Sequence, residues 1–240
     1  RYDVFLLQAQ GRRRWRIGRQ KDLSLVEGLP LKILAHFEPE HEYLLEPGDM
    51  LYLPPRWAHD GVAEGECMTY SIGFRQPARG ELAGELLQRL AEEAGDVLGE
   101  GAYRDPSQPA TASPGAVPPA MLAFAHEAVQ RLAGDAELLA MLLGEWLTEP
   151  KPDVWFDAGV EADADRARAV VLDRRTRMMH DARHVFINGE GFRAAGRDAG
   201  LMRKLADARQ LGASERQRLS APARALLAQW LQAGWAHESD

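Results

Sequence analysis

The fold is decided by the stretch Glu46-Pro47-Gly48-Asp49-Met50-Leu51-Tyr52-Leu53-Pro54-Pro55-Arg56-Trp57-Ala58-His59-Asp60-Gly61. Turn residues at 47–49 open a short apolar strand, and the pair Pro54-Pro55 closes it. Because each proline fixes φ and lacks an N–H donor, the chain must bend away from the sheet there. We therefore expect His59 to follow a rigid corner, which is a suitable position for a metal ligand.

Two strands are expected before this stretch, over residues 2–8 and 12–17, with a short Gln/Gly turn between them. Residues 4–7 form a continuous apolar run, which is typical of a strand covered on both faces. The second strand alternates, so that Arg13 lies on the same face as Trp15 and Ile17. If that face is the core, the guanidinium of Arg13 needs an anion, either a protein carboxylate or the carboxylate of a ligand.

A further strand is expected over residues 66–75, where the period of two puts Thr69 and Ser71 on one face. Their hydroxyls are candidates for hydrogen bonds to a ligand inside a barrel, and equally for bonds to each other or to the backbone. A strand is also expected over 31–37. His36 and His41, within and after it, are interpreted as surface or packing residues.

Helical spacing of apolar residues predicts helices over about 77–100, 119–133 and 135–148, with a Pro/Gly/Ser/Ala-rich loop at 104–119. The pair Asn188-Gly189 predicts a type I′ hairpin. Helices are expected around it at about 161–171, 198–209, 214–219 and 221–234. A β-ribbon among short helices indicates a winged-helix-like domain.

The spacing of Gly48, Pro54 and His59 matches the second conserved motif of the cupin superfamily, although the glycine expected two residues after the proline is Arg56 and the late asparagine is Ala63. Four segments match one branch more closely. They are Tyr2–Phe5, Gly11–Gly18, Glu46–Gly61 and Tyr70–Arg75. In them the chain resembles the bacterial ribosomal oxygenases, which are JmjC-type, iron- and 2-oxoglutarate-dependent arginine hydroxylases of a large-subunit ribosomal protein.

The resemblance implies an α+β protein of three parts. Residues 1–77 would be the C-terminal part of a double-stranded β-helix (cupin/JmjC) barrel. Residues 78–150 would form a helical dimerisation module, which makes a homodimer the expected assembly. Residues 151–240 would form the winged-helix-like domain.

The resemblance also assigns the site. His59 corresponds to the distal iron ligand, and Arg13 to the basic residue that holds the distal carboxylate of 2-oxoglutarate; Thr69 and Ser71 are the further candidates for cosubstrate binding. The other two ligands of the family, a His-x-Asp pair, fall immediately before residue 1. We therefore expect that an N-terminal part of the parent protein is missing, and that these residues alone are inactive. Two imidazoles and a carboxylate suit Fe(II) and leave positions open for 2-oxoglutarate and oxygen.

Charge and composition limit the partners. The net charge is −7, and residues 80–160 carry 4 basic and 14 acidic side chains. This argues against direct nucleic-acid binding. The acidic segment is either a solvated helical face or a surface that attracts a basic protein such as a ribosomal protein. The single cysteine, Cys67, and the absence of a long apolar run favour a cytoplasmic protein without membrane contact.

Two alternatives stay open. The first is a non-catalytic, cupin-like binding or regulatory protein with a winged helix. The second is another cupin enzyme that uses three histidines and recruits His36 and His41. A His-x-Asp pair upstream would favour the oxygenase over both.

Overall fold

The computed structural model describes residues 2–30, 32–159 and 168–239, and it divides into two compact units, Arg1–Leu82 and Ala83–Asp240. The first unit is a β-sheet, and the second is made of helices with two small sheets. The expected division into three domains stays a prediction.

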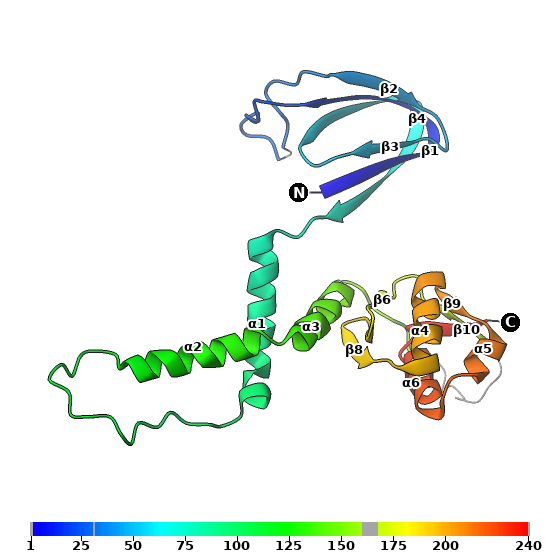
Figure 1. Cartoon of the computed structure of the whole chain (residues 1–240). Helices are drawn as coiled ribbons and strands as arrows, with labels where there is room; N and C mark the ends of the chain where they lie inside the picture. Colours follow the sequence, from blue (N-terminus) through cyan, green and yellow to red (C-terminus); the bar gives the residue numbers. More distant parts are fainter. Residues whose placement is uncertain (1, 31, 160–167, 240) are drawn as a thin grey trace. The chain divides into compact units, whose positions relative to one another are not determined.

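The first unit is organised by one long strand, β1 (Tyr2–Arg19), which pairs with every other strand of its sheet. On one side it pairs with β4 (Trp57–Arg75) along its whole length. On its other side it pairs first with β3 (Met50–Leu53) and then with β2 (His41–Leu45). All pairs are antiparallel, and β1 and β4 bend together so that the sheet curls (Figure 1). The described residues form this open sheet and no closed barrel.

The continuity of β1 corrects the expectation of two strands joined by a turn. Gly11, which suggested the turn, has a left-handed φ of 62° inside the strand, where the register against β4 shifts. It therefore marks a bulge. The bulge changes which residues face inward, because Leu6 and Gln8 are buried before it and Trp15 and Ile17 after it.

The inner face of the curled sheet carries the core of the first unit. Its buried members are Leu6, Trp15, Ile17, Leu45 and Leu53. Residues 4–7 were expected to be covered on both faces of the sheet, but the structure leaves their outer face open. Phe5 stacks there on Tyr52 and contacts Phe74 edge-on, with ring centroids 5.0 and 5.8 Å away. Tyr52 and Phe74 are 47% and 58% exposed, so this aromatic face lies open within the described residues.

The strand expected over 31–37 is wrong for the described residues 32–37. Leu34 makes a single antiparallel bridge with Leu25, and the segment is otherwise irregular. The apolar run there packs as a loop beside the sheet.

The second unit confirms the expected helices at its start. They are α1 (Arg79–Leu98), α2 (Pro119–Ala133) and α3 (Ala136–Thr148). Asp135 caps α3 by accepting hydrogen bonds from the backbone N–H groups of residues 137 and 138. Leu90 is the buried residue of α1, and α2 has none within the described part of the chain.

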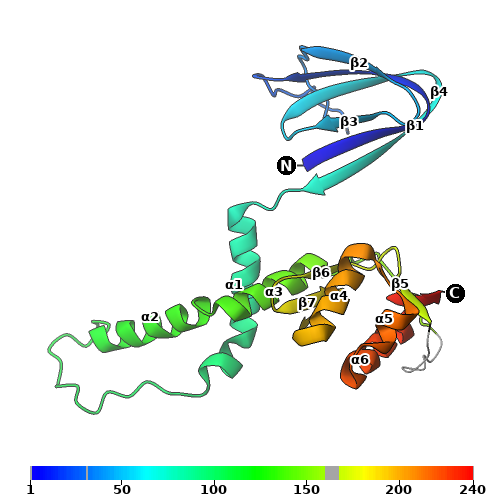
Figure 2. The same ribbon diagram turned by 45° about the vertical axis from the view of Figure 1, so that its right-hand side comes forward.

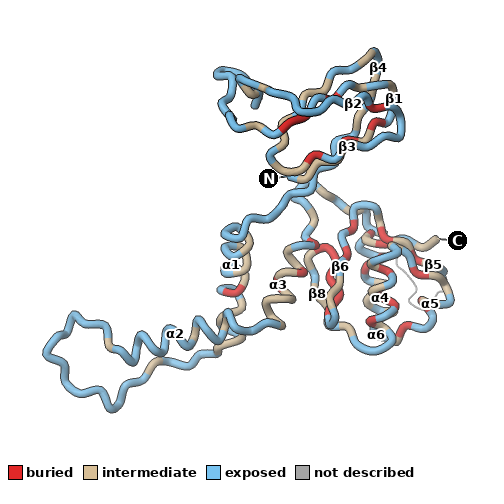
Figure 3. The backbone as a smooth tube through the Cα atoms, turned by 45° about the horizontal axis from the view of Figure 1, so that its top comes forward, coloured by how far each residue is buried: buried red, intermediate tan, exposed pale blue. Residues whose placement is uncertain are grey.

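The remainder of the second unit is a compact α+β body. Its strands are β5 (Ala169–Leu172), β6 (Met178–His180), β7 (His184–Ile187), β8 (Glu190–Arg193), β9 (Gln210–Leu211) and β10 (Ala236–Ser239). Its helices are α4 (Gly196–Ala208), α5 (Ala213–Gln217) and α6 (Ala221–Gln232). Buried residues of β5, β7, α4 and α6 make its core (Figures 2 and 3).

The predicted hairpin is confirmed at β7–β8, where Asn188 and Gly189 have φ values of 48° and 93°. Positive φ at both central positions is the geometry of a type I′ turn. The last three helices also form as expected. The helix expected at 161–171 falls mainly on residues outside the described ones, and residues 169–171 belong to β5 instead.

Candidate functional site

His59 stands near the start of β4, directly after the proline corner. The corner is a tight turn, in which the N–H of Trp57 donates to the carbonyl oxygen of Pro54 at 3.2 Å. Arg56 within it has a left-handed φ of 75°, which explains why the cupin pattern has glycine at this position. His59 lies opposite Ile17 in the β1–β4 register, so its side chain is on the inner face. The predicted position of His59, directly after a rigid corner, is confirmed.

Arg13 lies on the same inner face, as its alternation with Trp15 predicts. It is half-buried, and its guanidinium carbon is 5.5 Å from the centroid of the Trp15 ring. Its Nε is buried and has no hydrogen-bond partner within the described residues. A protein carboxylate was one of two predicted partners, and the described part of the chain offers Arg13 no ion pair. The ligand carboxylate is the alternative that this observation favours.

The neighbouring arginines behave differently. Arg14 forms ion pairs with Glu42 at 2.7 Å and Glu64 at 2.6 Å, and Arg16 forms one with Asp60. These side chains point to the outer face, where cross-strand charges match. The ion pair with Arg16 shows that the Asp60 side chain points away from that of His59.

Thr69 and Ser71 also lie on the inner face, opposite Gln8 and Leu6 of β1. The Thr69 hydroxyl donates to the Gln8 side-chain oxygen at 2.7 Å. With its proton committed there, Thr69 has only lone pairs left, and these do not bind a carboxylate. Ser71 is exposed, with no side-chain hydrogen bond among the described residues. The role of both as cosubstrate contacts stays a prediction.

Gln8 is a residue that sequence reasoning missed. Its side chain is fully buried, and its amide nitrogen donates to the carbonyl oxygens of Gln10 at 2.7 Å and Gly11 at 3.1 Å. These carbonyls lie in the bulge. In the sequence, Gln8 is a polar residue at the end of an apolar run and shortly before Gly11. That pattern on its own suggests a turn and not a buried side chain.

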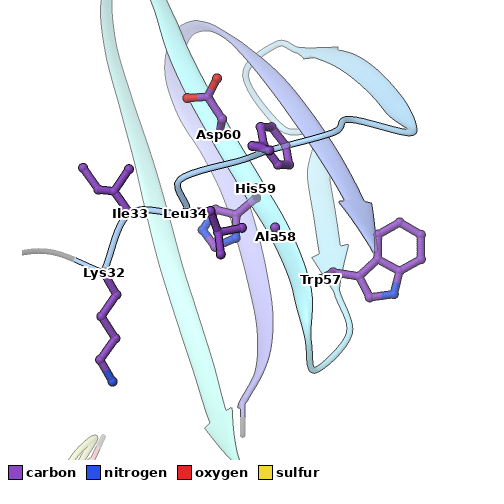
Figure 4. A pocket seen from close by; sticks show the side chains of 8 residues that line it. Lys32, Ile33, Leu34, Trp57, Ala58, His59 and Asp60 are labelled. Atoms are coloured by element: carbon purple, nitrogen blue, oxygen red, sulfur yellow. The ribbon is translucent and has the colours of Figure 1, made fainter. Parts of the chain in front are cut away.

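A pocket of about 530 Å³ adjoins His59. The segment 32–37 contributes one side of it, and the first residues of β4 contribute the other (Figure 4). Its lining residues are Lys32, Ile33, Leu34, Phe37, Trp57, Ala58, His59 and Asp60. The wall is mainly apolar, with one imidazole.

The metal site is incomplete in the part of the chain that the structure describes. No three histidine, cysteine, aspartate or glutamate side chains there come together in a way that could hold a metal ion. His36 and His41 are exposed, and His41 stacks on Trp57 with ring centroids 6.2 Å apart. An imidazole at His59 and a guanidinium at Arg13 that forms no ion pair with any described residue fit one metal ligand and one anion contact.

Comparison with known protein families matches both units. Residues 1–82 match the JmjC domain, and residues 130–237 match the ROXA-like winged helix. The chain is 33% identical over 156 residues to the ribosomal protein uL16 3-hydroxylase of Escherichia coli, covering 64% of this chain and 40% of that protein.

Solved structures agree. The chain is similar to Escherichia coli ycfD, with a TM-score of 0.82 at 27% identity, over 99% of this chain and 66% of that one. It is also similar to the ribosomal oxygenase YcfD from Escherichia coli in complex with cobalt and 2-oxoglutarate, with a TM-score of 0.77 at 26% identity. That match covers 100% of this chain and 65% of the other.

Helices in the described ranges are all too short or too polar to cross a membrane. The mixed α+β architecture, with a JmjC region followed by a winged helix, agrees with the relatives over the length that the chain shares with them. In its JmjC domain and its winged helix the chain resembles the JmjC-domain ribosomal oxygenases, and it spans only part of the full-length members.

Proposed function

We propose that the full-length protein is an Fe(II)- and 2-oxoglutarate-dependent oxygenase that hydroxylates an arginine side chain of a large-subunit ribosomal protein. The observation that carries the proposal is the shared inner face of His59 and Arg13, with the Arg13 Nε buried and unpaired within the described residues. The name of the Escherichia coli relative supports uL16 as the substrate protein.

The spacing of the two residues suits a short dicarboxylate. His59 lies opposite Ile17, and Arg13 is four residues from Ile17 along β1. Four strand residues span roughly 13 Å, so a molecule with an anionic group at each end could reach both side chains across the Trp15 ring. Cobalt and 2-oxoglutarate in the similar solved structure support the identity of the two ligands.

Each residue then has a role. The His59 imidazole would supply one of the metal ligands, and the Arg13 guanidinium would hold the distal carboxylate in a bidentate pair. Bound Fe(II) with 2-oxoglutarate would supply the oxidising chemistry for an unactivated C–H bond. The inner face would place the cosubstrate and limit its contact with water.

The helices support a homodimer as the assembly. Leu122 of α2 and Val129, about two turns later, are 59% and 63% exposed, and α2 contributes no buried residue in the described part of the chain. Apolar helical surface of this kind is typical of a subunit contact. The acidic character of residues 80–160 is compatible with a basic ribosomal protein as partner, and the single cysteine with a cytoplasmic site of action.

The test uses the full-length protein with Fe(II), 2-oxoglutarate and purified ribosomal proteins. We expect a gain of one oxygen, about 16 Da, on an arginine of one basic protein, with succinate formed in parallel. His59→Ala should remove both signals, and His36→Ala, a change to an exposed histidine, should remove neither. Succinate without peptide oxidation would contradict the substrate assignment. Absence of both products would favour the non-catalytic binding protein.

A further inference from the structure

The indole of Trp15 lies between the two residues assigned to the site. The centroid of its ring is 5.8 Å from the ring centroid of His59 and 5.5 Å from the guanidinium carbon of Arg13. The ring is 6% exposed, so it is part of the core rather than a surface contact. One rigid side chain therefore touches both site residues.

The ring has a specific seat on the facing strand. Trp15 lies opposite Gly61 of β4. A Cβ atom at Gly61 would lie 2.5 Å from Cζ3 of the indole, 2.7 Å from Cη2 and 2.8 Å from Cε3. Gly61 has no left-handed φ. Glycine is required there because of the space that the indole occupies and not because of the backbone.

Hydrogen bonding does not explain the position of the ring. The Trp15 Nε1 is buried and lacks a hydrogen-bond partner in the described ranges, as does the Arg13 Nε beside it. A buried indole N–H usually finds an acceptor. The ring is thus held by packing over Gly61, and within the described residues neither Trp15 Nε1 nor Arg13 Nε has a hydrogen-bond partner.

We propose that Trp15, seated on Gly61, is a positioning residue that fixes the separation of the His59 imidazole and the Arg13 guanidinium. Its flat face would also form the apolar floor under the carbon chain of a bound dicarboxylate. This inference rests on the proposed function of Arg13 and His59. It goes further by assigning the cosubstrate geometry to a tryptophan–glycine pair that binds neither metal nor carboxylate.

The test compares two glycine substitutions on the same strand. Gly61→Ala would displace the indole, whereas Gly73→Ala would place its Cβ at an ordinary 3.5 Å from the Tyr2 ring. Both positions face inward on β4. We expect Gly61→Ala to weaken 2-oxoglutarate binding to the cobalt-loaded full-length protein about tenfold or more, because small displacements of a positioning group have large effects. Gly73→Ala should stay within about twofold of the unsubstituted protein.

A second readout does not depend on the cosubstrate. In the ¹⁵N NMR spectrum of the chain, Gly61→Ala should shift the Trp15 indole N–H and Arg13 Nε–H resonances, and Gly73→Ala should leave both in place. If Gly61→Ala does not fold, Trp15→Phe replaces it, with Trp155→Phe as the control, since Trp155 belongs to the second unit and its side chain is 77% exposed. Trp15→Phe should weaken binding, and Trp155→Phe should not.

The outcomes separate this inference from the proposed function. Shifted resonances with unchanged 2-oxoglutarate affinity would overturn the positioning role. Unshifted resonances in Gly61→Ala would overturn the seat itself. If the unsubstituted cobalt-loaded protein does not bind 2-oxoglutarate, the proposed function fails, and the floor under a dicarboxylate is overturned with it.

Discussion

The Thr69 hydroxyl and the Gln8 side-chain oxygen form a hydrogen bond of 2.7 Å across the β1–β4 pair. The same glutamine side chain donates to two carbonyl oxygens of the bulge in β1. The pair therefore satisfies the backbone groups that the bulge removes from the ladder, and it does so inside the core, where unpaired polar groups are costly. Even-numbered residues of β1 face inward before the bulge and odd-numbered residues face inward after it. Because this contact stabilises the bulge, it helps to place the Arg13 side chain on the inner face.

Thr69→Val tests this contact. The substitution leaves the Gln8 oxygen buried without a donor, which should lower the free energy of unfolding of the first unit by about 1–3 kcal/mol. Thr69→Ser keeps the hydroxyl, so its free energy of unfolding should fall clearly less than that of Thr69→Val. Urea unfolding of both variants gives the comparison, and equal losses would mean that the hydroxyl contributes nothing.

Arg56 offers a gain in stability. Its φ of 75° is unfavourable for a residue with a Cβ, and glycine adopts it without that penalty. Arg56→Gly should therefore raise the free energy of unfolding by about 1 kcal/mol. The matched control is Arg56→Ala, which keeps the Cβ and should give no gain in the same urea titration. A gain in both variants would point to the arginine side chain and away from the backbone.

Asp173 gives the second unit a dependence on acid. Its carboxylate, 12% exposed, accepts hydrogen bonds from Arg175 at 2.9 Å and from His237 at 3.0 Å. The Arg175 hydrogen bond is the main reason that the pKa of Asp173 lies well below its usual range, and His237 adds to it. A depressed pKa stabilises the folded state fully above the unfolded value of about 3.9, and this contribution is lost progressively as the pH falls from there toward the lower folded pKa.

Asp173→Asn should therefore destabilise the second unit at pH 7, and the difference in the free energy of unfolding from the unsubstituted chain should begin to narrow as the pH falls below about 4. Denaturant unfolding at pH 7 and pH 3 measures it. Asp157→Asn is the control, since Asp157 also contacts Arg175 but is 94% exposed. A gap that persists undiminished at pH 3 would contradict the ionic origin.

The outer aromatic face should make the isolated chain associate. Phe74 and Ile72 are 58% and 43% exposed on one strand, close to other exposed aromatic rings. Contiguous apolar surface of this kind drives self-association. We expect concentration-dependent growth in sedimentation velocity, reduced in Phe74→Lys and not in Leu23→Lys, which removes an exposed apolar residue from the loop before β2. A monodisperse chain with a cooperative melting transition would contradict this expectation.

Local signals in the sequence predicted much of what the structure contains. The alternation around Trp15 placed Arg13 inward, and Asn188-Gly189 located the hairpin, because both features depend on neighbouring residues alone. The helices of the second unit follow from their periodicity in the same way.

Features that depend on distant partners were missed. Gly11 indicates a turn unless the Gln8–Thr69 contact, 61 residues apart in sequence, is known to hold β1 straight through it. The seat of Trp15 on Gly61 is likewise invisible without the register. The apolar run at 32–37 predicts a strand, but it found no continuous strand partner among the described residues and packs as a loop.

The central claim is that the inner face of the first unit binds the distal carboxylate of 2-oxoglutarate through Arg13. It is tested most directly by calorimetric titration of 2-oxoglutarate into the cobalt-loaded full-length protein, with Arg13→Gln and the outward-facing Arg12→Gln compared with the unsubstituted form. Loss of a charged bidentate pair should weaken binding by about 10- to 100-fold in Arg13→Gln, with Arg12→Gln near the unsubstituted value. Equal affinity of all three proteins would contradict the account.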